Sequence, residues 1–131
     1  NNLKLIFLLI TLFSRNLFAD GITAIELYKS CKNYHDWVSS KFDLPVDEKM
    51  LFDMGKCQGT VKATGKIMLT LCKEKKMNVN ISKQLAANLT GIKSFDIIEY
   101  LVDESIKANN LHKTDGQFFL MQIIEKKWPC L

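Results

Sequence analysis

The chain has 131 residues, of which 18 are basic and 14 acidic, so its formal net charge is +4. This length supports one small domain and not two. The lysines are scattered, and the one dense run, residues 73–76, contains Glu74 and no interleaved aromatic residue. Because nucleic-acid binding needs a basic patch, usually with aromatic stacking platforms, the sequence predicts no nucleic-acid partner. We interpret the run as a solvated connection.

Residues 1–19 have the order of a secretory signal peptide. Lys4 precedes nine residues without a charge, 5–13, and Ala19 is the expected cleavage site. Nine residues are too few for a transmembrane helix, which needs roughly 20. The sequence therefore predicts a cleaved signal peptide, no stable membrane insertion after cleavage, and one helical domain over residues 20–131 with 16 basic and 14 acidic residues. The alternative is an apolar helix that is kept as an anchor or buried in the core.

Four cysteines lie in this domain, at positions 31, 57, 72 and 130. An even number in a small exported chain is typical of a disulfide framework, and four thiols allow three connectivities. No CxxC pair occurs, and the spacings of 26, 15 and 58 residues do not match zinc-ligand patterns. We therefore expect two disulfides and no metal or other cofactor.

Helical periodicity reduces the number of possible disulfide pairings. Apolar positions recur at intervals of three and four along residues 22–42, namely Ala24, Leu27, Tyr28, Cys31, Tyr34 and Val38. A second helix is predicted from Cys57 to Cys72, with Val61, Thr64, Met68 and Leu71 on the same face. At about 1.5 Å per residue its terminal thiols are about 22 Å apart, whereas disulfide Cα atoms lie within about 7 Å of each other.

Two connectivities remain after Cys57–Cys72 is excluded. We favour Cys31–Cys57 with Cys72–Cys130, because a short link through residues 43–56 lets the first helix fold back beside the second. The other pairs Cys31 with Cys72 and Cys57 with Cys130. In the favoured pairing Cys130 ties the end of the chain to the far end of the second helix.

Further helical segments follow. Ser82 is a candidate N-cap for a helix through Leu85, Leu89 and Ile92, interrupted near Gly91. Ser94 is a candidate cap for the next, whose apolar face is Phe95, Ile98, Leu101 and Val102. Asp115 caps a last helix that Pro129 ends, with apolar residues Phe118, Phe119, Met121, Ile123 and Ile124. The predicted fold is an all-α, small, disulfide-stapled bundle of four or five helices.

Catalytic patterns are weak. Cys31, His35 and Asp36 have the local order of secreted phospholipases A2, but the Gly-rich calcium loop and the many cysteines of that class are missing. On a helix His35 has Cys31 as its i−4 neighbour, which favours a packing role. His112 lies in a polar stretch, which favours a solvated loop. No GxSxG or HExxH motif occurs, and oxidised cysteines leave no thiolate nucleophile, so we expect no enzyme activity.

Several short motifs occur in a fixed order along the chain. They are Cys31 in the first helix, a C-x-G motif (Cys57, Gln58, Gly59), Cys72, the pairs Gln84-Leu85 and Tyr100-Leu101, and the terminal Trp128, Pro129 and Cys130. Together with the signal peptide they resemble the Tai-type (Rap/Tai) immunity proteins of the type VI secretion system. The resemblance covers nearly all of residues 20–131. Thr60 stands where the family often has an aromatic residue, and Asp103-Glu104 stand where it often has His-Pro.

The resemblance implies an all-helical, periplasmic protein, often a homodimer. Such a protein binds an injected peptidoglycan amidase toxin and blocks its active-site cleft, so that the cell survives attack by its siblings. The alternative function is a periplasmic helical chaperone or general binding module, which would expose apolar surface and loosen at low pH.

A cleft-blocking inhibitor needs a rigid scaffold and a protruding element. The polar stretch between the last two predicted helices is the favoured toxin-binding element, with one apolar residue displayed among hydrogen-bonding groups. Its residues are Asn109, Asn110, Leu111, His112, Lys113, Thr114 and Asp115. The alternatives are an ordinary solvated connection at this point and a contact surface at residues 73–80.

Overall fold

The computed structural model describes residues 21–76 and 85–131. The predicted signal peptide and the predicted cap Ser82 lie outside these residues. The described part contains four α-helices, α2 (Ala24–Ser39), α3 (Glu48–Lys76), α4 (Ser94–Lys107) and α5 (Gly116–Lys127), and a short 3₁₀ helix, η3 (Leu111–Lys113). Pairing of extended backbone within it is limited to two isolated bridges, Thr23 with Asp115 and Ala87 with Pro129. The all-α prediction is confirmed.

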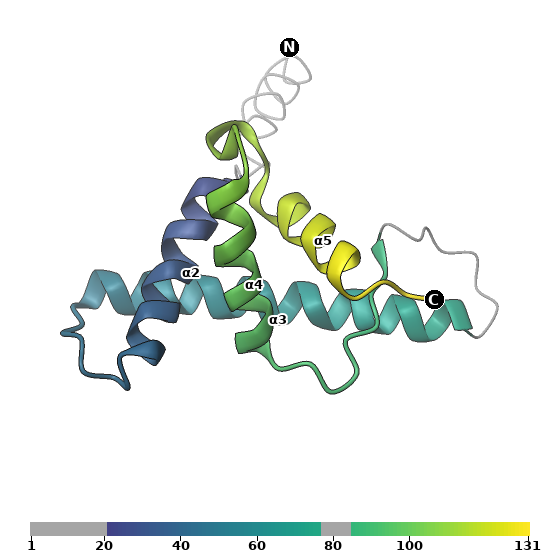
Figure 1. The fold of residues 1–131 in the computed structure, drawn as a ribbon, viewed down its shortest axis with the longest axis horizontal. Coiled ribbons are helices and arrows are strands. Elements are labelled where there is room, and N and C mark those ends of the chain that lie inside the picture. Colours follow the sequence, from purple (N-terminus) through teal and green to yellow (C-terminus); the bar gives the residue numbers. More distant parts are fainter. Residues whose placement is uncertain (1–20, 77–84) are drawn as a thin grey trace, which may run out of the picture.

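The long helix α3 is the base of the molecule. Helices α2, α4 and α5 lie across one side of it and contact it (Figure 1). The core fills the space between them, and its largest fully buried side chains include Leu27, Met68, Ile98, Leu101, Leu120 and Ile124. Each of the four helices contributes at least one of these residues, so the three shorter helices need α3 to cover their apolar faces.

Helix α2 begins at a capping box. The Thr23 hydroxyl accepts a hydrogen bond from the Glu26 N–H, and the Glu26 carboxylate accepts one from the Thr23 N–H at 2.9 Å. The helix ends three residues before the predicted limit of 42, because Lys41 and Phe42 take left-handed φ angles of 56° and 69°. Their N–H groups bond back to the carbonyls of Val38 and Trp37, which closes the last turn.

Helix α3 is longer than predicted at both ends. Its first turn is capped by Asp47, whose carboxylate accepts a hydrogen bond from the Met50 N–H at 2.8 Å. The predicted link 43–56 is therefore wrong beyond Asp47, and Cys57 lies well inside the helix. Met54 continues the buried spacing of Cys57 and Val61 toward the N-terminus. Residues 73–76 form the last turn of α3 and not a solvated connection.

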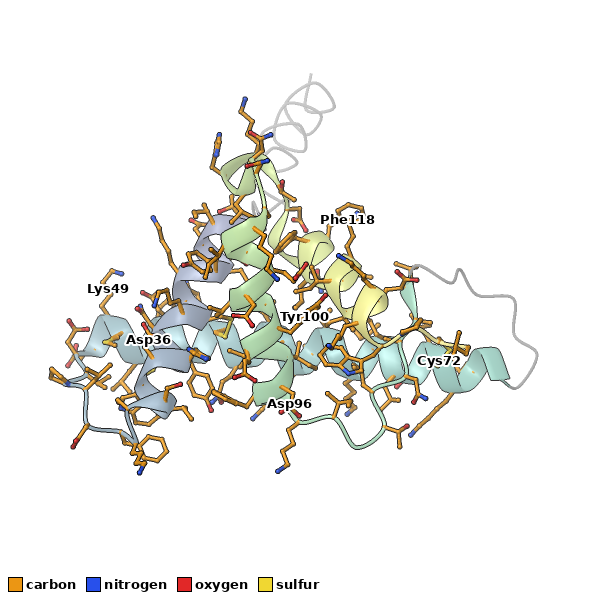
Figure 2. The ribbon with its side chains drawn as sticks, in the orientation of Figure 1. Asp36, Lys49, Cys72, Asp96, Tyr100 and Phe118 are labelled. Atoms are coloured by element: carbon orange, nitrogen blue, oxygen red, sulfur yellow. A yellow bond between two sulfur atoms is a disulfide. The ribbon has the colours of Figure 1, made fainter. Side chains whose placement is uncertain are left out.

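Both disulfides of the favoured connectivity are present. Cys31–Cys57 joins α2 to α3 with a Cα–Cα distance of 5.0 Å, and Cys72–Cys130 joins α3 to the last residues with a distance of 5.6 Å. Lys49 near the start of α3 and Cys72 near its end are labelled in Figure 2. All four cysteines are thus oxidised. Two disulfides of this kind indicate an oxidising compartment outside the cytoplasm.

The predicted helix through Leu85, Leu89 and Ile92 does not form in the described residues 85–92. The Ala87 N–H instead bonds to the Met68 carbonyl at 3.1 Å, and the Asn88 N–H bonds to the Trp128 carbonyl at 2.9 Å. This segment therefore bridges α3 and the C-terminal residues. Its side chains Ala86, Ala87 and Leu89 are buried, because the tertiary contacts prevail over the weak local helical spacing.

Helices α4 and α5 start close to the predicted points. The N-cap of α4 is Lys93 and not Ser94, and the Lys93 N–H donates to the Asp96 carboxylate at 3.0 Å. Asp115 caps α5 as predicted, since its carboxylate accepts a hydrogen bond from the Phe118 N–H at 2.7 Å. Phe118, one of the apolar residues of α5, is 57% exposed and therefore does not belong to the core.

Candidate functional site

The predicted toxin-binding segment, residues 109–115, connects α4 to α5. It lies at the end of the molecule farthest from α3, beside the start of α2 (Figure 1). The connection contains η3, which contacts α2. The segment therefore protrudes from the bundle and is supported by helices on both sides.

The C-terminal end of the segment is fixed to the residues at the start of α2. The Ala24 N–H donates to the Thr114 carbonyl, and the Gly116 N–H donates to the Ile22 carbonyl, each at 2.8 Å. A Cβ atom at Gly116 would lie 2.7 Å from the Ile22 carbonyl oxygen. Only glycine permits this close approach of two backbone segments.

The middle of the segment is a tight turn. Asn110 has a left-handed φ of 63°, a conformation that asparagine tolerates better than most residues. Its carbonyl accepts hydrogen bonds from the Lys113 N–H at 3.0 Å and from the Thr114 hydroxyl at 3.1 Å. These bonds give the polar turn one defined shape.

The turn displays polar side chains and no apolar one. Leu111 is only 9% exposed, so the prediction of a displayed apolar residue is wrong. It packs inward because η3 contacts α2. The structure leaves Thr114 half-buried, and the exposed side chains are those of Asn109, Asn110, His112, Lys113 and Asp115. The segment can therefore offer amide, imidazole and ammonium groups to the hydrogen-bonding wall of a cleft.

The alternative surface at residues 73–80 is only partly described. Residues 73–76 belong to α3, and residues 77–80 lie outside the described residues. The exposed side chain that the structure shows here is Lys73. The structure therefore describes this surface less completely than residues 109–115.

His35 has a packing environment. Its ring stacks on Phe95 with a centroid distance of 5.6 Å and an interplanar angle of 3°, and its Nδ1 lies 3.4 Å from the Asp36 carboxylate. The Lys32 ammonium bonds to the other oxygen of that carboxylate at 2.6 Å and lowers the pKa of Asp36. Cys31 is oxidised, so this histidine has no thiolate to activate. His112, as predicted, is exposed to solvent.

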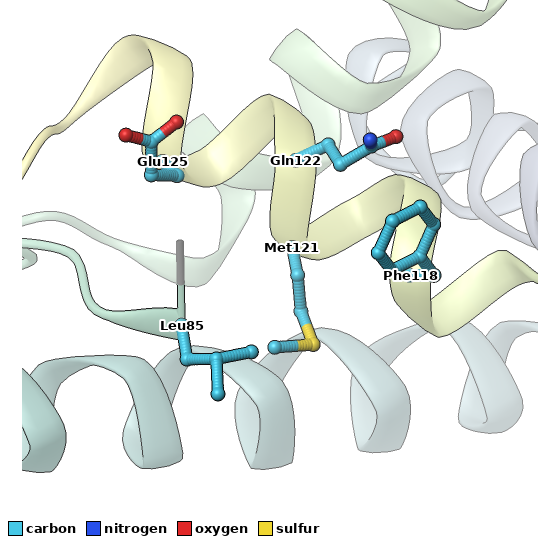
Figure 3. Close-up of a pocket in the computed structure, with 5 residues that line it drawn as sticks. All are labelled: Leu85, Phe118, Met121, Gln122 and Glu125. Atoms are coloured by element: carbon cyan, nitrogen blue, oxygen red, sulfur yellow. The ribbon is translucent and has the colours of Figure 1, made fainter. Parts of the chain in front are cut away.

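Of the surface hollows elsewhere, two border α5 and α2. One, of about 340 Å³, is lined by Leu85, Phe118, Met121, Gln122 and Glu125, with Met121 pointing toward Leu85 (Figure 3). The other, of about 390 Å³, lies between α2 and α3 and is lined mainly by charged residues, among which Asp53 pairs with Lys49 and Lys56. Within residues 21–76 and 85–131 no group of three histidine, cysteine or carboxylate side chains is arranged to hold a metal ion.

Exposed apolar residues near the start of α3 were missed by the sequence patterns. Phe42, Leu44, Leu51 and Phe52 all lie within twelve residues of chain and are exposed. Such grouping is more informative than single exposed apolar side chains. For Phe52 the sequence did contain an indication of exposure, because this residue does not follow the three- and four-residue spacing of Met54, Cys57 and Val61.

Comparisons of the chain with protein-family models, with curated proteins and with solved structures find no match. Among the described helices, none has both the length and the apolar character that a membrane span requires.

Proposed function

We propose that this chain is a periplasmic immunity protein that binds a type VI secretion peptidoglycan amidase and inhibits it by blocking the active-site cleft. The observation that carries the proposal is the polar segment 109–115, which is shaped by its own hydrogen bonds and fixed at its C-terminal end to the start of α2. Preorganisation lowers the entropic cost of binding, so a rigid protrusion suits an inhibitor. The motif order that resembles the Tai-type proteins supplies the expected partner.

The two disulfides support the same function. An inhibitor of a toxin that acts on the cell wall must remain folded in an oxidising compartment without cytoplasmic chaperones. Cys31–Cys57 and Cys72–Cys130 restrict the unfolded chain and tie both outer parts of the sequence to α3. The binding element is thereby held by a stabilised scaffold.

The direct test is inhibition of the amidase encoded beside this chain. The oxidised protein is titrated into the enzyme on peptidoglycan fragments, and activity is expected to fall to zero at a stoichiometric ratio. Replacing the exposed polar side chains Asn109, Asn110, His112 and Lys113 together by alanine is expected to raise Kd at least about 100-fold, since the contacts of the protrusion are lost.

A matched control uses exposed polar residues of the helices. Lys29→Ala and Glu99→Ala change charge outside the segment and are expected to leave Kd within about twofold of the parent value. Circular dichroism should show unchanged helix content in all variants. If the variant with four alanine replacements binds the amidase with unchanged affinity, the segment is not part of the interface. If the parent protein does not inhibit the amidase, that enzyme is not its partner.

A chaperone or general binding module is the second candidate function. The observation that favours it is the exposed apolar group Phe42, Leu44, Leu51 and Phe52. Suppression of aggregation of several unrelated unfolded proteins at acidic pH, at substoichiometric amounts, would support this function over specific inhibition.

A further inference from the structure

The polar hollow between α2 and α3 is a candidate site separate from the 109–115 segment. The two helices cross where Cys31 is bonded to Cys57, and the hollow lies beside this crossing (Figure 1). Its volume of about 390 Å³ falls within the range of small-molecule sites. The residues that line it come from both helices and are Glu26, Lys29, Ser30, Asn33, Lys49, Asp53 and Lys56.

Helical spacing brings these side chains together and sets the length of the hollow. On each helix the lining residues lie three or four positions apart, so they project from one side of it. Glu26 and Asn33 enclose about 10 Å of α2, and Lys49 and Lys56 enclose about 10 Å of α3. Lys49 projects from α3 on the side on which α2 lies (Figure 2). Since three residues of extended peptide span about 10 Å, the hollow matches a tripeptide in length.

The wall formed by α3 has an excess of positive charge. The Asp53 carboxylate accepts a hydrogen bond from the Lys49 ammonium at 2.9 Å, and the Lys56 ammonium lies 3.5 Å from its other oxygen. One carboxylate therefore balances two ammonium groups, which leaves one positive charge. Because the Lys49 side chain is 85% exposed, its ammonium can turn toward a ligand. This wall is suited to a carboxylate.

The wall formed by α2 carries a carboxylate with one oxygen outside the capping box. Both the N–H and the hydroxyl of Thr23 bond to Oε2 of Glu26, each at 2.9 Å. The second oxygen, Oε1, is available to accept a hydrogen bond from a ligand. Lys29, one turn further along α2, balances the charge of Glu26. This wall is suited to an amino group.

Uncharged polar groups lie between the two walls. Ser30 is only 3% exposed, and its hydroxyl has no hydrogen-bond partner within residues 21–76 and 85–131. In the same part of the chain every fully enclosed polar side-chain atom is hydrogen-bonded, so this hydroxyl must open into the hollow. The Asn33 amide beside it can both donate and accept. These groups are suited to the N–H and C=O of a peptide bond.

We propose that the hollow between α2 and α3 binds a short peptide with free amino and carboxyl ends. The peptide carboxylate contacts Lys49 and Lys56, and the amino group contacts Oε1 of Glu26. Ser30 and Asn33 bond to the peptide groups between these ends. Inorganic phosphate also suits lysines, but it has no group for Glu26 and would be repelled by that carboxylate. The proposal does not depend on inhibition of an amidase.

The test is an NMR titration of the ¹⁵N-labelled, oxidised protein with trialanine that has both ends free, up to about 10 mM. We expect a Kd of about 0.1–1 mM, because a small ligand held by solvent-exposed charges binds weakly. The amide signals of residues 29–33 and 49–56 should shift. N-acetyl-trialanine and trialanine amide each lack one charge and should bind about threefold to tenfold more weakly.

Two substitutions test the walls separately. Glu26→Gln keeps the capping box, since glutamine also serves at the N3 position. It should raise the Kd of trialanine about threefold to tenfold and leave that of N-acetyl-trialanine unchanged. Lys56→Gln should raise the Kd of trialanine by the same factor and leave that of trialanine amide unchanged. Lys66→Gln, exposed on α3 about 15 Å further along, is the matched control and should not change any Kd.

The amidase assay separates this site from the proposed inhibitor function. Glu26→Gln and Lys56→Gln should leave the Kd for the amidase unchanged, and helix content by circular dichroism should be that of the parent protein. Trialanine that shifts no signal up to about 10 mM, or shifts signals outside both helices, would overturn the proposal. So would inorganic phosphate that binds more tightly than trialanine, which would assign the hollow to simple anions. Because trialanine is titrated without the amidase, a negative result leaves the inhibitor function untouched.

Discussion

Gly116 is the residue on which the attachment of the 109–115 segment most depends. Gly116→Ala would place a methyl group 2.7 Å from the Ile22 oxygen and 2.9 Å from the Thr23 oxygen. Because both are backbone atoms, the chain must shift, and we expect a loss of about 1–3 kcal/mol in the free energy of unfolding. Urea denaturation measures this loss. Gly59→Ala, whose Cβ meets no neighbour, is the control and should stabilise by about 0.5–1 kcal/mol. Equal urea midpoints for Gly116→Ala and Gly59→Ala would contradict the conclusion that the close backbone approach at position 116 requires glycine.

Carboxylates that accept hydrogen bonds make stability depend on pH. The hydrogen bond from Lys32 lowers the pKa of Asp36 below its usual value of 3.8, and the corresponding bonds from Lys49 and Lys107 lower the pKa of Asp53 and Glu104. A lowered folded-state pKa contributes stability that is present above the unfolded pKa and lost as pH falls through the folded value.

The thermal midpoint should therefore be nearly constant from neutral pH down to about pH 5 and fall below about pH 4. Asp36→Asn should lower the midpoint at neutral pH and make the acid slope shallower. The effect will be small, since the Asp36 side chain is 41% exposed and its ion pair is screened by solvent. If the thermal midpoint of Asp36→Asn falls with pH as steeply as that of the parent protein, Asp36 does not contribute to the acid sensitivity.

At the scale of elements, the two disulfides restrain loops of different size. Cys72–Cys130 closes a loop of 58 residues and Cys31–Cys57 one of 26. On loop-closure entropy each contributes roughly 2–4 kcal/mol, and the larger loop contributes about 0.7 kcal/mol more. Replacing each pair by two alanines and measuring urea unfolding tests this order. A larger loss for Cys31–Cys57 would indicate that the link between α2 and α3 contributes more than entropy alone.

The helix boundaries show how elements depend on one another. The caps at Thr23 and Asp115 were readable from the sequence, and Asp115 was predicted correctly. The start of α3 was not predicted, because its first three turns carry few buried residues and periodicity is weak there. The segment 85–92 was predicted as a helix, but its N–H groups bond to α3 and to Trp128 instead. Such non-local partners leave no local signal.

For the whole molecule, the proposed toxin-binding segment and the exposed apolar residues near the start of α3 lie on different parts of the bundle. The segment is at the end distant from α3 (Figure 1). Substitutions at Lys113 and at Phe52 are far apart in the structure, so their effects should be separable. The inhibitor and chaperone functions can therefore be tested independently.

The connection between α4 and α5 was predicted from the sequence in position but not in detail. A polar stretch between two apolar periodic segments indicated the protruding connection at 109–115. The prediction that this connection displays Leu111 to solvent was wrong. Whether a single apolar residue points inward depends on a neighbouring helix that is distant in sequence. The exposure of Phe52 likewise depends on which side of α3 the other helices cover.

The sequence by itself determined the helical class and the presence of a disulfide framework, and together with helix geometry it excluded the Cys57–Cys72 pair. These follow from spacing along the chain, because helical periodicity and rise are local properties. The tertiary structure decided which side of α3 is covered, where α3 begins, that Leu111 is buried and that Gly116 must lack a side chain. These depend on the approach of residues far apart in sequence, since burial is a property of the packed elements and not of any one of them.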